Sequence, residues 1–306
     1  MTTARTEPPR APPPPRRIGR DDPLYPPLLR SLDNAPDALY ARGDPALLGE
    51  TAAAVVGARR ATSLGLEMGE RLGAGLAAAG VVVVSGCAIG IDAAAHRGAL
   101  DAGGATVAVL AGGLDVAIPP SNRRLASRIL RERGCLAGEH PDGVPPARYS
   151  FPRRNRIIAG LARVVVVVEA AQHSGALITA RLALAAGREV MVVPGHPLQE
   201  EFAGSNALLT DGARPVTKAE DVLEELKGLP RLEPAPIERG EGGAGLAPAG
   251  VRADVRAALD DRPRAAEDLA ADLGFPLGPV LAALTELELV GLARACPGQR
   301  YTRPVR

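Results

Sequence analysis

The sequence predicts an α/β protein, in which a doubly wound, mostly parallel sheet is followed by a small C-terminal winged-helix domain. Apolar runs such as Val81–Val84 and Val164–Val168 contain no polar residue, which is typical of strands buried on both faces. Segments that favour helix separate these runs, and strands that alternate with helices form parallel sheets with right-handed crossovers. Three amphipathic segments and a Pro-Gly turn after residue 250 predict the second domain.

Composition limits the class of protein. The chain has 306 residues, 46% of them hydrophobic and 2% aromatic, so the core must consist mainly of Ala, Val and Leu. A formal net charge of +1 excludes a globally basic coat for nucleic acid, so an anion site requires a local cluster. Three distant cysteines without a Cys-x-x-Cys pair argue against disulfides and fit a reducing compartment. With no signal-peptide pattern and no apolar run of membrane-spanning length, we expect a cytoplasmic protein without membrane insertion.

The N-terminal region is expected to contribute little regular structure. Residues 1–20 are rich in Pro and Arg and poor in apolar side chains, which predicts a disordered tail. The tail arginines could contact a polyanion, although a solvated tail is the simpler interpretation. They are Arg5, Arg10, Arg16, Arg17 and Arg20. Residues 21–50 read as a packed but irregular lead-in to the α/β domain, which is predicted to span 21–227.

The strands and helices of this domain follow from the apolar runs and the helix boundary signals between them. Ser63 is expected to cap the first helix and Gly80 to end it. The five-valine run at 164–168 must be a central strand, whereas 135–139 is a short strand or an edge. The predicted strands are 52–56, 81–84, 105–110, 135–139, 164–168 and 189–193. The predicted helices are 63–79, 93–100, 119–132 and 174–186.

The C-terminal part consists of a linker and a small domain. Residues 228–250 turn to Pro, Gly and Glu, a composition typical of linkers. Three helices and a hairpin within 251–306 predict the winged-helix domain, which holds eight arginines and eight acidic residues. Because a reader of duplex DNA normally has a basic footprint, this neutral module fits a protein contact at least as well as a DNA contact.

The turn after the second valine strand is a possible phosphate cradle. Ser85 and Gly86 end the strand, and Gly90 precedes a helix. Free amides and the helix dipole at such a turn favour an anion. A tight structural turn without a ligand explains the same residues, and the sequence alone leaves both interpretations open.

A basic segment with aromatic residues indicates contact with unpaired nucleic acid. Between Asp142 and Glu169 there is no acidic residue, and Tyr149 and Phe151 lie among the arginines. Guanidinium groups pair with phosphates and aromatic rings stack on unpaired bases. A solvated basic loop with Phe151 in the core is the alternative. The arginines are Arg148, Arg153, Arg154, Arg156 and Arg163.

The sequence gives little support to catalysis. The four histidines have no metal-ligand spacing, and there is no P-loop and no Gly-x-Ser-x-Gly elbow. Ser85, Asp92 and His96 could be brought together as a triad, but a chain of this length offers many such sets. We therefore predict no metal, no cofactor and no catalytic residue.

Several of these stretches together resemble one family, the DNA-processing protein DprA, also called Smf. The resemblance extends from about residue 22 to 303. It is carried by Val56-Gly57-Ala58-Arg59, by Ser85 to Asp92 with Ala95-His96, by Ala111 to Asp115 with Pro119 and Asn122, by Phe151-Pro152-Arg153-Arg154-Asn155-Arg156-Ile157-Ile158-Ala159-Gly160-Leu161, by Glu169-Ala170 with Ser174 to Ala180, by Pro194-Gly195, by Gly204-Ser205-Asn206 with Gly212-Ala213, and by Glu286 to Leu289 with Gly298 and Tyr301.

The resemblance implies an extended Rossmann-like domain that binds single-stranded DNA without catalysis. It also implies a homodimer that protects incoming DNA and loads the RecA recombinase onto it during natural transformation. Arg59 matches the arginine of the family's Val-Gly-Ser-Arg motif, and we expect it to share one electropositive hollow with Phe151 and Arg156. The DNA-binding residues predicted from motif and charge together are Arg59, Ser85, Gly86, Arg148, Phe151, Arg153, Arg154, Asn155, Arg156, Ser174 and Gly175.

The chain departs from the family pattern at three positions, and two other functions compete with this prediction. Ala58 and Ala176 replace serines of two motifs, and Gly138 stands where serine is usual. The main alternative is a nucleotide-acting phosphoribohydrolase of the same Rossmann-like group, whose catalytic glutamate would fall at Leu182, a side chain that cannot act as acid or base. A nicotinamide oxidoreductase fits poorly, because Ser85 ends the strand where an acidic ribose ligand is expected.

Overall fold

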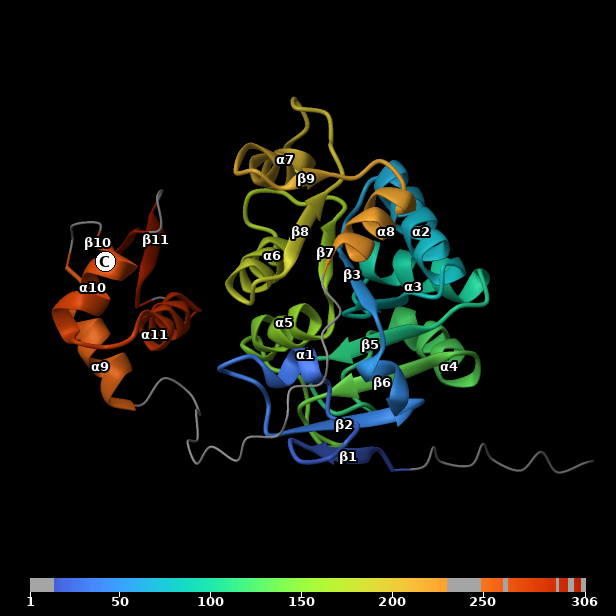
Figure 1. Ribbon diagram of the computed structural model, residues 1–306, viewed down its shortest axis with the longest axis horizontal. Coiled ribbons are helices and arrows are strands. Elements are labelled where there is room, and N and C mark those ends of the chain that lie inside the picture. The colour runs from blue at the N-terminus through green and yellow to red at the C-terminus, as the bar shows by residue number, and fades with distance from the viewer. Residues whose placement is uncertain (1–13, 230–248, 261–263, 290–291, 297–299, 304–306) are drawn as a thin grey trace, which may run out of the picture. The chain divides into compact units, whose positions relative to one another are not determined.

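A computed structural model describes residues 14–229, 249–260, 264–289, 292–296 and 300–303. The chain divides into two compact units within the stretch 230–248. The predicted linker, 228–250, lies almost wholly outside the described residues. Each unit is described by itself below (Figure 1).

The first unit is built on a nine-stranded sheet with the strand order β1-β2-β6-β5-β4-β3-β7-β8-β9. Strands β3 to β9 run parallel to their neighbours, whereas β2 pairs antiparallel with both β6 and β1. This is the predicted doubly wound, mostly parallel sheet. The strands are β1 Arg16–Gly19, β2 Ala38–Gly43, β3 Ala52–Val56, β4 Val82–Ser85, β5 Thr106–Leu110, β6 Gly134–Gly138, β7 Val164–Val167, β8 Glu189–Val192 and β9 Arg214–Pro215.

Helices cover both faces of the sheet. The helices α2, α3, α4 and α8 pack on one face, and α1, α5 and α6 pack on the other. The helices are α1 Pro27–Arg30, α2 Ser63–Ala78, α3 Ile91–Asp101, α4 Arg123–Arg131, α5 Ser150–Leu161, α6 Gly175–Ala185, α7 Ala203–Thr210 and α8 Ala219–Gly228. Short 3-10 turns are η1 Pro45–Gly49, η2 Pro120–Asn122 and η3 Glu200–Phe202.

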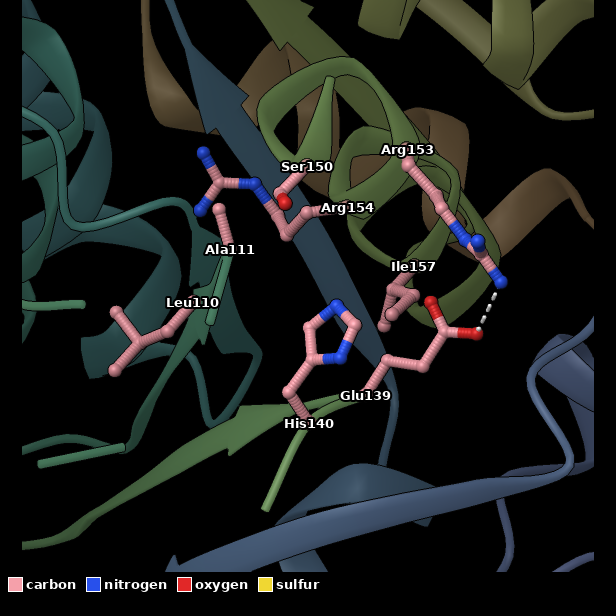
Figure 2. Close-up of a pocket in the computed structure, with 8 residues that line it drawn as sticks. All are labelled: Leu110, Ala111, Glu139, His140, Ser150, Arg153, Arg154 and Ile157. Atoms are coloured by element: carbon pink, nitrogen blue, oxygen red, sulfur yellow. Dashed lines mark hydrogen bonds and ion pairs between the residues drawn. The ribbon is translucent and has the colours of Figure 1, made fainter. Parts of the chain in front are cut away.

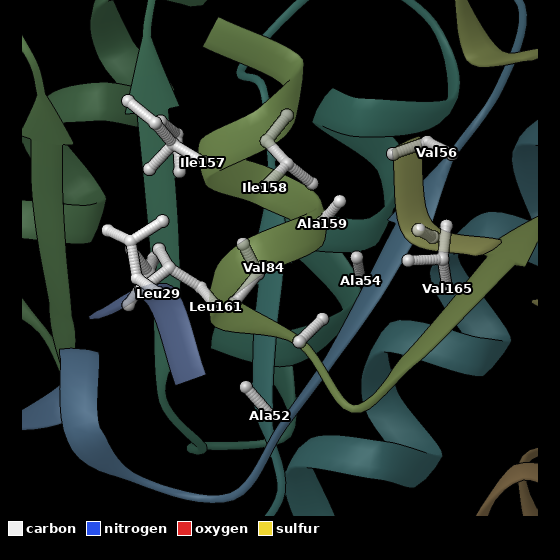
Figure 3. Packing of buried hydrophobic residues seen from close by; sticks show 14 of the residues in the cluster. Leu29, Ala52, Ala54, Val56, Val84, Ile157, Ile158, Ala159, Leu161 and Val165 are labelled. Carbon is white, nitrogen blue, oxygen red and sulfur yellow. The ribbon is translucent and has the colours of Figure 1, made fainter. Parts of the chain in front are cut away.

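Alternation along the strands divides the core into two layers. Ala54 and Val84 face the layer under α5, while Ala53 and Val83 face the layer under α2 and α3. Successive side chains of a strand point to opposite faces, so strands made only of Ala and Val supply both layers. Figure 3 shows Ile158 of α5 packed among these small side chains. The low aromatic content of the chain is therefore compatible with close helix-to-sheet packing.

The structure corrects the predicted N-terminal tail. Residues 1–13 lie outside the described residues, but Arg16–Gly19 forms the edge strand β1, with Ile18 opposite Leu39 of β2. Ile18 is fully buried in the same cluster as Tyr25 and Leu29. The composition of residues 1–20 did not indicate this strand, because Ile18 is its only apolar side chain. The strand forms because residues of the lead-in, such as Leu39 and Tyr25, bury this one isoleucine. The lead-in is also more regular than expected, since it contributes α1, β2 and η1.

Three further features of the first unit differ from the prediction. Thr62, rather than Ser63, caps α2, because its Oγ1 accepts a hydrogen bond from the Gly65 amide at 3.0 Å. Strand β6 is an interior strand, because β2 covers its outer side. Residues 150–161, for which the sequence predicted no helix, form α5. Pro152 lies in the first turn of this helix, where a missing N–H costs no hydrogen bond.

The second unit confirms the predicted winged helix. It contains α9 Ala249–Ala258, β10 Arg264–Ala265, α10 Ala266–Leu273, α11 Leu277–Leu289, β11 Arg294–Cys296 and β12 Arg300–Thr302. The three strands form an antiparallel sheet in the order β10-β12-β11. Val255, Leu269 and Leu284 meet in its buried core, and Gly274 ends α10 in the left-handed conformation at a φ of 69°. In the parts of the chain that the structure describes, no helix has the length and hydropathy of a membrane span.

The correction at β1 can be tested by truncating Ile18. We expect Ile18→Ala to lower the free energy of unfolding by about 2–5 kcal/mol, the usual cost of removing a buried aliphatic side chain. The exposed neighbour Arg17 is the matched control, and Arg17→Ala should change it by less than about 0.5 kcal/mol. Urea unfolding followed by circular dichroism measures both. Equal, small effects of the two substitutions would show that this segment is not part of the folded sheet.

Candidate nucleic-acid interface

The candidate site lies at the carboxyl ends of the parallel strands, where α/β sheets place their ligands. The chain order reverses at β3, with β4, β5 and β6 on one side of it and β7, β8 and β9 on the other. The loops that follow β3, β4, β5 and β7 meet at this edge, and the first turn of α5 reaches it. The predicted site residues come from these loops and from α5.

Arg59 and Phe151 form the centre of the site. The guanidinium carbon of Arg59, in the loop after β3, lies 5.1 Å from the centroid of the Phe151 ring at the start of α5. A cation over an aromatic face at this distance is an attractive cation–π contact. Arg59 is exposed and Phe151 half-buried. A positive charge and an aromatic surface are thus presented side by side, although 92 residues separate them in the sequence.

Further basic and aromatic side chains surround this pair. Arg60 and Arg148 are exposed, and Arg153 is exposed while its guanidinium donates to Glu139 Oε1 at 3.1 Å. Tyr149 is 66% exposed. It was not among the predicted site residues, yet the sequence offered a signal: an aromatic residue next to Arg148 in a chain with only four tyrosines and three phenylalanines.

Arg154, predicted as a DNA contact, does not belong to the exposed set. The side chain is only 7% exposed. Its Nη1 donates to the carbonyls of Gly86, at 2.8 Å, and of Val109, and its Nε donates to Asn155 Oδ1 at 3.2 Å. These bonds hold the start of α5 against the ends of β4 and β5. Gly86 is needed beside it, because a Cβ there would come within 2.6 Å of the guanidinium.

One of the chain's own carboxylates occupies the predicted phosphate cradle. Asp92 Oδ2 accepts hydrogen bonds from the amides of Gly86 at 3.1 Å and of Ala88 at 3.4 Å. Burial raises the pKa of this carboxyl, whereas the charge of Arg154 and the two amides lower it. The cradle is therefore a structural turn, which was the alternative interpretation, and its Gly86 and Ala88 amides are not available to a ligand.

A second carboxylate fills the neighbouring helix N-terminus. Glu169, fully buried after β7, accepts hydrogen bonds from the amide of Thr62 at 3.1 Å and from its hydroxyl at 2.8 Å. The N-terminus of α2 next to the point where the strand order reverses is the position that commonly holds a nucleotide phosphate in sheets of this kind. Here the negative charge is supplied from within the chain.

Ser85, Asp92 and His96 do not form a triad, because Ser85 and His96 are buried and have separate hydrogen-bond partners. The Ser85 hydroxyl donates to the Val55 carbonyl at 2.7 Å. His96 Nδ1 lies 2.7 Å from Thr106 Oγ1, which donates its own proton to the Val83 carbonyl, so Nδ1 carries a hydrogen. Burial is the main cause that lowers the pKa of His96 to about 3. His96 is thus a neutral structural residue, and Ser85 does not face the site.

The remaining predicted residues divide between α5 and the start of α6. Arg156 is 7% exposed and its Nη2 donates to Glu139 Oε1 at 2.7 Å, so it does not join Arg59 and Phe151 in the expected hollow. Asn155 donates to the Gly175 carbonyl at 3.3 Å, and Ser174 caps α6 by accepting from the Ala176 amide. Gly175 itself is exposed. Asn155 therefore fixes α6 against α5 and leaves the turn open to a ligand.

A small pocket lies beside this arrangement, between the ends of β5 and β6 and the first turns of α5. Figure 2 shows Arg153 reaching from α5 to Glu139, with His140 next to it and Arg154 directed away toward the sheet. Glu139 thus receives Arg153 and Arg156 together. This one carboxylate pairs with two of the predicted cations and offsets one of their two charges. Among the described residues, Arg59, Arg60 and Arg148 have no acidic partner at the edge.

Comparison with known proteins identifies the family. The family model described as DNA recombination-mediator protein A matches residues 16–227, and the DprA winged helix domain matches 242–299. The chain belongs to the DprA family. Protein Smf of Escherichia coli is 40% identical over 282 residues, which is 92% of this chain and 75% of that protein. A putative DNA processing protein DprA of Mycobacterium tuberculosis is 44% identical, over 88% of this chain and 69% of that protein.

Solved DprA structures resemble this fold. The DprA structure from Streptococcus pneumoniae has a TM-score of 0.66 and 41% identity, over 69% of this chain and 74% of that chain. The DprA structure from Helicobacter pylori, whose study concerns its single-stranded DNA binding mode, has a TM-score of 0.60 and 31% identity, over 66% of this chain and 92% of that chain. The predicted DprA resemblance is confirmed, and with it membership of a DNA-processing family.

The structural role of Arg154 predicts a stability effect. Arg154→Ala should lower the free energy of unfolding by about 3–5 kcal/mol, because it leaves the carbonyls of Gly86 and Val109 without this donor and removes a charge that offsets the buried Asp92. The exposed Arg148 gives the control, for which Arg148→Ala should change stability by less than about 0.5 kcal/mol. Urea unfolding distinguishes the two. A fully stable Arg154→Ala protein would show that its carbonyl contacts do not hold α5 in place.

The buried His96 predicts a pH dependence of stability. An unfolded histidine binds a proton near pH 6.5, whereas folded His96 does so only at about pH 3, so stability falls as the pH drops below 6.5. Between pH 6.5 and pH 5 the loss should be about 2 kcal/mol. Urea unfolding at both pH values, compared with His96→Asn, isolates this contribution. An identical pH dependence in the two proteins would contradict it.

Proposed function

We propose that this chain binds single-stranded DNA at the carboxyl edge of its sheet, around Arg59 and Phe151. The observation that carries the proposal is their contact, which places a guanidinium over a ring at an exposed edge. An unpaired base can stack on an aromatic ring while an arginine pairs with its phosphate, a combination common to proteins that bind single strands. The study of single-strand binding by the Helicobacter pylori relative supports the same ligand here.

The predicted residues take two roles in this proposal. The first group contacts DNA directly through exposed or half-buried groups: Arg59, Arg148, Phe151, Arg153, Ser174 and Gly175. Tyr149 joins this group as a second exposed ring. The other group shapes the site from beneath: Ser85, Gly86, Arg154, Asn155 and Arg156. Because this second group is hydrogen-bonded inside the fold, its substitution should act through stability rather than through direct loss of a contact.

We also propose that the binding is not accompanied by catalysis. His96 is neutral and buried, and burial raises the pKa of the Cys87 thiol to about 12. Asp92 and Glu169 are engaged by main-chain amides. For a phosphoribohydrolase-like activity, Leu182 stands where the acid or base would be required, so this alternative has less support. Release of a free base from a nucleotide by the purified protein would favour it instead.

Family membership supports the wider role that we propose. In this role a homodimer in the cytoplasm covers incoming single strands and loads RecA onto them during natural transformation. Binding without cleavage is compatible with such a transfer, because the strand must remain intact for the recombinase. The test is RecA filament assembly on single strands coated with single-strand-binding protein. Faster assembly in the presence of this chain is expected, and an unchanged rate would contradict the loading role.

The central contact predicts a selective loss of affinity. Phe151→Ala should weaken binding to a thymidine oligonucleotide by roughly 1–3 kcal/mol, the usual value of one base stacked on an aromatic residue. Phe151→Tyr, which keeps the ring, is the matched control and should bind nearly as well as the wild-type protein. Fluorescence anisotropy across a salt series gives the dissociation constants. If Phe151→Ala binds like wild type, the ring does not contact the strand.

A further inference from the structure

A basic stripe on α4 stands apart from the site described above. The segment 123–133 holds five arginines and one acidic residue, Glu132, although the whole chain has a net charge of only +1. At about 100° per residue, the four helix arginines fall within an arc of about 140°. The opposite side of α4 is apolar and packs on β5 and β6 through Leu125 and Ile129. The stripe consists of Arg123, Arg124, Arg128 and Arg131 on the helix, with Arg133 directly after it.

Most of these charges are uncompensated. Arg128 pairs with Asp101 and Glu132, both at 2.8 Å. The other four side chains are exposed. Within the described part of the chain, none of these four makes an ion pair or a side-chain hydrogen bond. Some exposed arginines elsewhere are paired: Arg71, for example, forms an ion pair with Glu67 on its own helix. Four exposed arginines that have no acidic partner among the described residues, on a nearly neutral protein, fit an anionic partner.

The stripe begins at the same edge as Arg59. The loop after β4 connects the two, because the Ile91 amide donates to the Ala58 carbonyl at 3.2 Å, next to Arg59. On its other side, the Asn122 amide group donates to the Cys87 carbonyl of this loop at 2.9 Å, immediately before Arg123. From there α4, nine residues long, spans about 13 Å. Figure 1 shows it on the outside of β5 and β6.

We infer that the α4 stripe is a second contact for the phosphate backbone, along which a single strand continues after it leaves Arg59 and Phe151. This inference rests on the proposed binding of single-stranded DNA. The stripe has no aromatic residue in 123–133, so it offers charge without stacking. It should bind phosphates regardless of base and act only on strands long enough to extend beyond the edge. An acidic protein is the other polyanion that could occupy it, and the experiment below separates the two.

The test compares short and long oligonucleotides. We take thymidine strands of about 8 and about 30 nucleotides, because single-strand sites cover roughly 4–16 nucleotides. The double substitution Arg124→Ala with Arg131→Ala removes the centre of the stripe. For the long strand we expect about tenfold weaker binding, and a salt slope of the binding constant smaller by about 1.4, the value for two phosphate contacts on single strands. Binding of the short strand should not change.

The matched control removes two charges that are exposed but already ion-paired, Arg71→Ala with Arg214→Ala, and should leave both strands bound as in wild type. Equal binding of the long strand by the stripe variant and wild type would overturn the inference and favour an acidic protein partner. Equal weakening for short and long strands would overturn it as well, because the stripe would then not be an extension of the path. If the wild-type protein binds neither strand, the proposed function itself fails.

Discussion

The buried guanidinium of Arg154 is the interaction on which the site depends. It joins the carbonyls at the ends of two neighbouring strands to the start of α5, and its charge offsets the buried Asp92. Phe151 lies one turn before it on the same helix. The position of the ring against Arg59 is therefore fixed from beneath, by a residue that is itself buried. The motif that contains Phe151 thus supplies both the ring that contacts Arg59 and the arginine, Arg154, that anchors the helix carrying this ring.

At the same edge, the chain's own carboxylates fill the two positions where sheets of this kind commonly bind phosphate. Asp92 occupies the turn after β4 and Glu169 the N-terminus of α2, which are the two positions where amides would otherwise attract phosphate. Because the chain supplies these negative charges itself, the remaining cations of the edge lie further out, on exposed side chains. Arg59, Arg148 and the stripe on α4 form such an outer layer, suited to a polymer that lies across the surface rather than to a small ligand in a crevice.

Much of the fold could be predicted from the sequence, because strands such as Ala52–Val56 carry their signal locally. The winged helix and the approach of Arg59 to Phe151 could also be predicted from the sequence. Two features could not be predicted in this way. Strand β1 depends on one isoleucine whose burial is decided by residues on another segment. The separation of Arg154 and Arg156 from the exposed arginines depends on which carbonyls and carboxylates lie opposite each side of α5, and spacing within a motif does not encode this.

The central claim is that the ring of Phe151 holds a base while the guanidinium of Arg59 holds the backbone. The most direct measurement compares binding of a thymidine strand with that of an abasic strand of equal length, for wild type, Phe151→Ala and Arg59→Ala. The account predicts that Phe151→Ala weakens binding of the thymidine strand only, whereas Arg59→Ala weakens binding of both. Equal losses on the two strands for Phe151→Ala would contradict it.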